Sequence, residues 1–114
     1  MTDMITKIVD EAADAAETAV TDAEQRMGGD FGACGFAWVT VYPENKGNTR
    51  AGREERRILE AMGFSKDWTG KTYQLWNPGN YRGQNIDIKE AGARAYSKVL
   101  NTYGFRASAG SRLD

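Results

Sequence analysis

One apolar stretch constrains the fold of this chain more than any other. It spans residues 31–42 and has the sequence FGACGFAWVTVY. Aromatic and β-branched residues dominate it, a composition typical of a β-strand. Because Phe36 and Trp38 alternate with residues that are also apolar, we expect a central strand covered on both faces. Trp38 and Cys34 are therefore expected in the core, Cys34 as a small hydrophobic residue.

Three other stretches carry apolar residues at steps of three and four. This periodicity predicts helices over residues 3–27, 50–62 and 88–103. Each of these stretches is followed by glycine, which favours the end of a helix. The third helix is expected to begin with a capping box, in which Asp87 is the cap and Glu90 the returning carboxylate.

The remaining segments predict two short strands and several turns. Strands are expected at residues 71–76 and 105–108, a turn at residues 65–70, and a polar tail at residues 110–114. A helix end followed by Gly-Phe occurs twice, 41 residues apart, at Gly63 and Gly104.

The order of these elements is helix, strand, helix, strand, helix, strand. It predicts an α+β fold with a small three-stranded sheet packed with helices. We expect an acidic N-terminal helix over residues 1–29 and one compact α+β domain over residues 30–114.

Charge is distributed unevenly along the chain. Residues 1–30 contain eight acidic and two basic side chains, a net charge of −6, whereas residues 31–114 contain 13 basic and eight acidic ones, a net charge of +5. This asymmetry fits a solvated acidic helix face, or an acidic arm beside a basic binding surface. The acidic helix can dock on its own sheet, mask the basic surface or pair with a second copy.

The residue types present make an enzyme improbable. The chain has no histidine and one cysteine, which excludes histidine-based acid-base catalysis, Cys-His pairs and an all-thiolate zinc site within one chain. No string matches a cofactor-binding motif. No apolar run approaches the ~20 residues of a membrane span. We therefore expect a non-enzymatic cytoplasmic protein with no cofactor and no membrane partner.

Basic and aromatic residues nominate a binding surface. Phosphates attract cations and unstacked bases stack on aromatic rings, and arginine does both. The candidate binding residues are Lys46, Asn48, Arg50, Arg53, Arg57, Trp68, Lys71, Trp76, Arg82, Arg106 and Arg112. Two polar loops, residues 46–50 and 78–85, form an alternative site that reads a small nucleotide.

Three strings resemble parts of small uncharacterised proteins of tailed bacteriophages. They are ACGFAWV at residues 33–39, KEAGARA at residues 89–95 and SRLD at residues 111–114. The resemblance covers residues 31–114 and carries no functional residues over. It implies a phage protein that acts in the cytoplasm of an infected bacterium.

Together these observations predict a phage accessory protein that binds nucleic acid or another polyanion through a basic and aromatic face. Two alternatives remain open. One is a host-protein inhibitor that acts in takeover or anti-defence by protein contact, which predicts an exposed apolar patch. The other is a protein that sequesters a small nucleotide. A homo-oligomer formed through the N-terminal helix is compatible with each.

Overall fold

The computed structural model describes residues 2–114. Within this range the chain forms three α-helices and a four-stranded sheet, so the mixed α+β class is confirmed and the predicted three strands are wrong. The elements in chain order are α1 (Thr2–Met27), β1 (Gly35–Val41), α2 (Arg50–Ala61), β2 (Ser65–Lys66), β3 (Tyr73–Trp76), α3 (Ile86–Thr102) and β4 (Ala107–Leu113).

The sheet has the strand order β2-β3-β1-β4, and all neighbouring strands are antiparallel. After α1, the connectivity β1-α2-β2-β3-α3-β4 is that of the split β-α-β fold. The predicted apolar stretch is the central strand: Trp38 of β1 lies opposite Trp76 of β3 and opposite Gly110 of β4.

The two edge strands differ from the prediction. Ser65 and Lys66, expected in a turn, pair with β3 as the short strand β2. Residues 110–114 were expected as a polar tail, but residues 110–113 continue β4, which starts at Ala107 rather than at residue 105. Alanine, serine and glycine have little β-propensity of their own, so pairing along the whole of β1 decides that this segment is a strand.

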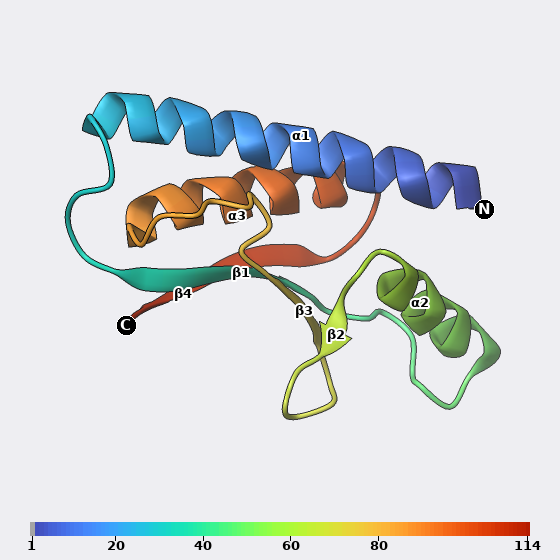
Figure 1. Cartoon of the computed structure of the whole chain (residues 1–114). Helices are drawn as coiled ribbons and strands as arrows, with labels where there is room; N and C mark the ends of the chain where they lie inside the picture. Colours follow the sequence, from blue (N-terminus) through green and yellow to red (C-terminus); the bar gives the residue numbers. More distant parts are fainter. Residues whose placement is uncertain (1) are drawn as a thin grey trace.

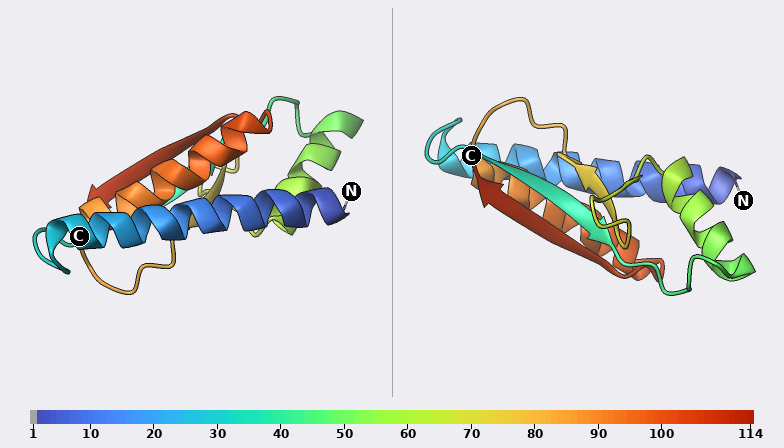
Figure 2. Two further views of the ribbon diagram at one scale, coloured as in Figure 1. Left: turned by 90° about the horizontal axis from the view of Figure 1, so that it is seen from above. Right: turned by 90° about the horizontal axis from the view of Figure 1, so that it is seen from below.

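Both long helices lie on one side of the sheet (Figure 1). α3 packs against β1 and β4, and α1 packs along α3. The right-hand view of Figure 2 shows the opposite face of β1 and β4 with no helix over it. The expectation that β1 is covered on both faces is therefore wrong. Only Ala37, Val39 and Val41 face the core, because antiparallel sheets commonly pack one face and leave the other to solvent.

α1 is docked on its own chain. Ile8, Ala12 and Ala16 belong to the same buried cluster as the core residues of β1. Close packing requires small residues: a Cβ placed on Gly92 of α3 would lie 2.9 Å from Val20 Cγ2 on α1. While α1 stays docked, its apolar stripe is not available to a second copy.

α2 and α3 end in the same way, as the repeated Gly-Phe pattern predicts. Gly63 and Gly104 have φ values of 97° and 93°, a conformation that favours glycine. The next amides close the cap: Phe64 N donates to the Leu59 carbonyl at 3.0 Å, and Phe105 N to the Leu100 carbonyl at 3.2 Å. These are the bonds of a Schellman motif.

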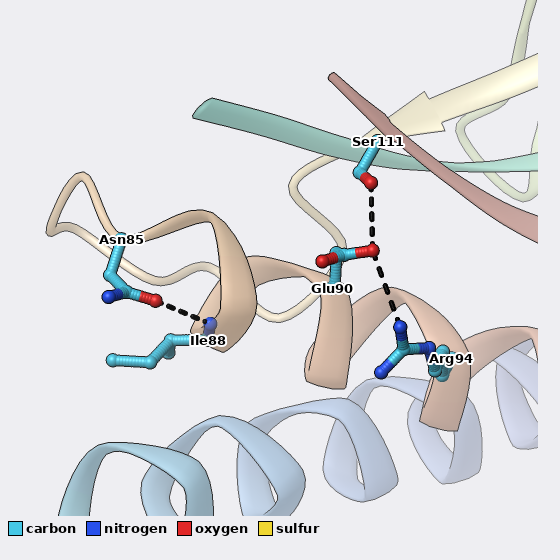
Figure 3. A network of polar contacts seen from close by, with 5 residues as sticks. All are labelled: Asn85, Ile88, Glu90, Arg94 and Ser111. Carbon is cyan, nitrogen blue, oxygen red and sulfur yellow. Dashed lines mark hydrogen bonds and ion pairs between the residues drawn. The ribbon is translucent and has the colours of Figure 1, made fainter. Parts of the chain in front are cut away.

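The start of α3 differs from the prediction. Asn85 is the N-cap, and its Oδ1 accepts a hydrogen bond from Ile88 N at 2.9 Å (Figure 3). The predicted capping box at Asp87 is wrong, because Glu90 instead accepts from Ser111 Oγ at 2.8 Å and pairs with Arg94 at 3.3 Å. Asn85 is 2% exposed and also donates to the Phe31 carbonyl. This tertiary contact with Phe31 thus places the N-cap at Asn85, two residues before the predicted cap at Asp87.

Within residues 2–114, no helix combines the length and apolar character that crossing a membrane requires. Cys34 is exposed rather than buried. It precedes β1 at the end of the sheet, where it bridges to Asn85 and its carbonyl accepts from Asp114 N at 3.1 Å.

Candidate functional site

Three aromatic side chains gather on the uncovered face of the sheet. Phe36 and Trp38 project from β1 and Trp76 projects from β3. The ring centroids of Trp38 and Trp76 are 4.7 Å apart with an interplanar angle of 30°, and those of Phe36 and Trp76 are 6.1 Å apart. Trp76 is 47% exposed, and the other two are half-buried. We call these three residues the aromatic face.

Strand geometry explains this cluster. Side chains two residues apart point to the same side of a strand, and directly paired residues share a face. Because Trp38 pairs with Trp76, the alternation that sends Ala37 and Val39 into the core sends both indoles outward. Trp38 was expected in the core, and that expectation is wrong.

A glycine on β4 makes room for Trp38. A Cβ placed on Gly110 would lie 2.7 Å from Trp38 Nε1, so the absence of a side chain lets the indole lie close to the strand. On the neighbouring strand, Trp76 Nε1 donates to Gln74 Oε1 at 3.3 Å. Both indoles are therefore oriented by their own sheet.

Two cations lie against the aromatic face. Arg112 of β4 pairs with Phe36, and its Cζ is 5.6 Å from the Phe36 ring centroid and 6.0 Å from that of Trp76. Lys89 Nζ is 5.4 Å from the Phe36 centroid. All three distances are within the range of cation–π attraction. Arg112 thus adds an exposed positive charge to the aromatic face, whereas Lys89 is buried.

Lys89 reaches the sheet from α3 at a gap in the strand ladder. β3 ends at Trp76, and the following amide, Asn77 N, donates to the Ala37 carbonyl at 2.9 Å. The next acceptor on that side of β1, the Gly35 carbonyl, accepts from Lys89 Nζ at 2.9 Å. The lysine replaces a strand donor. Its side chain is only 8% exposed, which its hydrogen bond and the neighbouring ring help to offset.

Asp30 holds the loop that opens this gap. Its Oδ1 accepts hydrogen bonds from Tyr81 OH at 2.8 Å and from Asn85 N at 2.9 Å, and Gln84 N donates at 3.1 Å. These bonds, led by that of Tyr81, lower the pKa of Asp30. Burial, then the Asp30 hydrogen bond, raises the pKa of Tyr81. The junction ties the segment before β1 to the loop before α3.

All the candidate binding residues nominated from the sequence are exposed, but they are not gathered on one surface. Trp76 and Arg112 come together on the aromatic face. Trp68 and Lys71 lie in the loop between β2 and β3. The remaining seven lie on α2 or in loops: Lys46, Asn48, Arg50, Arg53, Arg57, Arg82 and Arg106.

The arginines of α2 share one side of that helix with an acid. Arg50, Arg53 and Arg57 line a shallow depression that also contains Glu54. Arg57 pairs with Glu54 at 3.1 Å. Arg53 Nη1 donates to the Asn48 carbonyl at 3.2 Å. Part of their charge is therefore engaged within the chain.

The other basic residues lie beside acids or in a separate loop. Arg82 lines a groove with Glu17, Glu24 and Asp30. Arg106 lines another with Glu44, Glu54 and Glu55. Lys46 lies in the loop before α2, where its carbonyl accepts from Thr49 Oγ1 at 2.7 Å. None of these three contributes to the aromatic face.

The two polar loops, residues 46–50 and 78–85, lie toward opposite ends of the sheet (Figure 1). They do not face each other across a common pocket. Residues 2–114 also contain no cluster of three or more His, Cys, Asp or Glu side chains able to hold a metal ion.

Sequence reasoning missed Phe36, Trp38 and Lys89 as site residues. The alternation of aromatic with small residues in β1 contained the signal for the first two, because an antiparallel sheet with few helices leaves one face open. Lys89 had no such signal. It lies on the buried side of α3. It becomes the donor to the Gly35 carbonyl only because β3 ends at Trp76.

The fold and this face define an α+β protein with an exposed aromatic sheet surface and an exposed arginine, Arg112, against its rings. Comparisons of the chain with protein-family models, with curated proteins and with solved structures find no match. The geometry of the site is therefore the basis for its function.

Proposed function

We propose that this protein binds single-stranded nucleic acid on its aromatic face. The observation that supports the proposal best is the Trp38–Trp76 pair on an open sheet, with Arg112 against its edge. Base–aromatic stacking contributes about 1–3 kcal/mol per base. Sheets that carry aromatic residues on their central strands bind two or three unstacked bases of RNA in this way.

The chemistry favours a single strand over a duplex. Bases in a duplex are stacked on each other, and their flat surfaces are not available to a protein ring. The aromatic face presents ring surface rather than a projecting helix that fits a groove. Because Arg112 is its exposed cation and Lys89 is buried, the face should neutralise few phosphates, so the salt dependence of binding should be shallow.

The resemblance to phage proteins supports placing this activity in the cytoplasm of an infected bacterium. Exposed tryptophans also suit contact with a host protein, because they are frequent anchors of protein interfaces. The exposed Arg112 beside the rings favours nucleic acid as the partner, since a cation and aromatic rings together match phosphate and base. A free nucleotide has the same two groups and stays an alternative ligand of the same face.

The test measures the affinity of a labelled oligonucleotide of about ten nucleotides, within the usual range of single-strand site sizes. We expect Trp76→Ala to weaken binding by about 5- to 150-fold, the equivalent of losing one stacked base. Phe31→Ala is the matched control, because Phe31 is an exposed ring outside the sheet. Far-UV circular dichroism verifies that each variant is folded.

Charge provides a second, independent arm. Arg112→Gln should reduce the slope of log affinity against log salt by about one. Arg26→Gln removes the same charge from α1, on the helical side of the sheet, and should leave the slope unchanged. Unaltered affinity in a folded Trp76→Ala variant would contradict the proposal. Equal affinity for duplex and single strand would contradict it too.

A further inference from the structure

We propose that the hairpin of β2 and β3 carries a second stacking site, Trp68, which extends the bound strand beyond the aromatic face. This inference rests on the proposed function. It assigns the hairpin a role in binding longer strands.

The exposure of Trp68 is the first observation. Its side chain is 95% exposed, so it contributes almost no packing to the fold. An indole left in water forgoes the stabilisation that burial of a large apolar side chain provides. Lys66 and Lys71 flank the loop on both sides and are exposed. Ring and cations together again match base and phosphate.

The second observation is that this exposed loop is held by its own hydrogen bonds. Asp67 Oδ1 accepts from Thr69 Oγ1 at 2.7 Å, and Asp67 Oδ2 accepts from Thr72 Oγ1 at 2.7 Å. The backbone closes the turn, with Gly70 N donating to the Asp67 carbonyl at 3.0 Å. A loop ordered before binding loses less entropy when a ligand arrives.

The carboxylate that holds the loop is charged at neutral pH. The hydrogen bonds from Thr69, then those from Thr72, lower the pKa of Asp67 to about 2. Ionised carboxylates make stronger hydrogen bonds than neutral groups do. The turn therefore stays organised throughout the physiological range.

The hairpin projects on the side of the sheet that carries the aromatic face. In Figure 1 the loop between β2 and β3 extends away from α1 and α3, and the view from below in Figure 2 agrees. Trp76 is three residues from Tyr73, Tyr73 pairs with Lys66, and Trp68 is two residues beyond Lys66. At about 3.3 Å per residue, Trp68 is therefore roughly 15–20 Å from Trp76.

A polar row lies between the two stacking sites. Gln74 is two residues before Trp76 on β3 and therefore faces the same side. It pairs with exposed Ser65 of β2 and with Thr40 of β1, which is buried, and exposed Ser108 follows on β4. Hydroxyl and amide groups at this position suit the sugars and phosphates of a strand that crosses from the aromatic face to the hairpin.

The test compares a trinucleotide, which the aromatic face can hold alone, with an oligonucleotide of about ten nucleotides. We expect Trp68→Ala to weaken binding of the longer oligonucleotide by about 5- to 150-fold, one stacked base, and to leave trinucleotide affinity unchanged. Trp76→Ala is the contrast variant and should weaken both. Because Trp68 is almost fully exposed, its replacement should not change the melting temperature.

Two further measurements examine the mechanism. Asp67→Ala keeps the indole but removes the bonds that hold the turn, and should weaken binding of the longer oligonucleotide alone. In a chain that carries Trp38→Phe and Trp76→Phe, Trp68 is the remaining tryptophan. Its fluorescence should change on addition of the longer oligonucleotide and not on addition of the trinucleotide.

The outcomes separate this inference from the proposed function. If Trp76→Ala weakens both ligands and Trp68→Ala weakens neither, the hairpin site is refuted and the aromatic face stands. If Trp68→Ala weakens binding of both ligands equally, Trp68 belongs to the aromatic face, and a separate hairpin site is refuted. If the unaltered protein binds neither ligand, both proposals are refuted.

Discussion

At the scale of single residues, Asp30 shows how one carboxylate organises the site from outside it. It accepts bonds from Gln84 and Asn85, 54 and 55 residues further along the chain. Through these bonds Asp30 fixes the loop before α3. This loop departs from β3, and the Gly35 carbonyl is therefore open to Lys89. Its residue type suggested no such role, because an aspartate that follows two glycines looks like ordinary turn chemistry.

The lowered pKa of Asp30 has a consequence for stability. The folded state binds the proton more weakly than the unfolded state, so ionised Asp30 stabilises the fold above its unfolded pKa of about 3.9. This contribution should fall as pH drops below that value toward the folded pKa. Urea unfolding of the wild type and of Asp30→Asn measures it. We expect the wild type to be more stable at neutral pH and the difference to shrink at about pH 3.

Asp67 also has a lowered pKa, so the wild type alone does not isolate Asp30. The Asp30→Asn comparison does, because Asp67 is present in both chains. A stability difference between the two chains that stays constant from neutral pH to about pH 3 would show that the ionised carboxylate does not hold the loops together.

At the scale of elements, the two ends of α3 differ in how local their causes are. The Schellman cap at Gly104 repeats the one at Gly63, and both could be predicted because they depend on a glycine and on residues within one turn. The N-cap could not. Asp87 and Asn85 are both acceptable caps, and the contact of Asn85 with the Phe31 carbonyl decides between them.

This difference predicts unequal costs for two substitutions. Asn85→Ala should lower the free energy of unfolding by about 1–2 kcal/mol, the upper part of the range for losing an N-cap. Asp87→Ala should lower it by about 0.3–1 kcal/mol, because Asp87 interacts only with the helix dipole at an exposed position. Chemical denaturation of both variants measures this. Equal losses of unfolding free energy in the two variants would show that Asn85 and Asp87 share the capping role.

β4 is likewise determined by a tertiary contact rather than by its own residues. Its sequence, ASAGSRL, has little β-propensity, and we expected a tail over most of it. β1 supplies the pairing partner, and the register that follows brings Arg112 beside Phe36 and Gly110 beneath Trp38. The prediction of Trp76 and Arg112 as binding residues used composition alone, whereas their proximity depends on this register.

At the scale of the whole molecule, charge and fold are arranged in layers. The acidic α1 packs on α3, on the side of the sheet opposite the aromatic face (Figure 1). In this docked position α1 does not mask the face. Negative charge behind the sheet and exposed Arg112 at the open face favour approach of a polyanion from the open side.

The docking of α1 depends on close approach at Gly92, and this leads to a prediction. Gly92→Val should destabilise the protein by about 1–3 kcal/mol, because the new side chain overlaps Val20. Adding Val20→Ala should recover part of that loss, which a double-mutant cycle measures as coupling. Lys98→Val is the control for placing a β-branched residue in α3, since Lys98 is exposed. Strict additivity of Gly92→Val and Val20→Ala would contradict the packing.

The sequence by itself determined the helices to within two residues, their glycine ends, the apolar central strand and the unequal distribution of charge. These features depend on residues within about one helical turn or on alternation along one strand. Only the tertiary structure decided which face of β1 stays open, where α3 begins, and which cations meet Phe36, Trp38 and Trp76. The physical reason is that these outcomes depend on contacts between residues tens of positions apart. Several partners have similar local preferences, and the strand register and the path of the loop before α3 decide which of them come together.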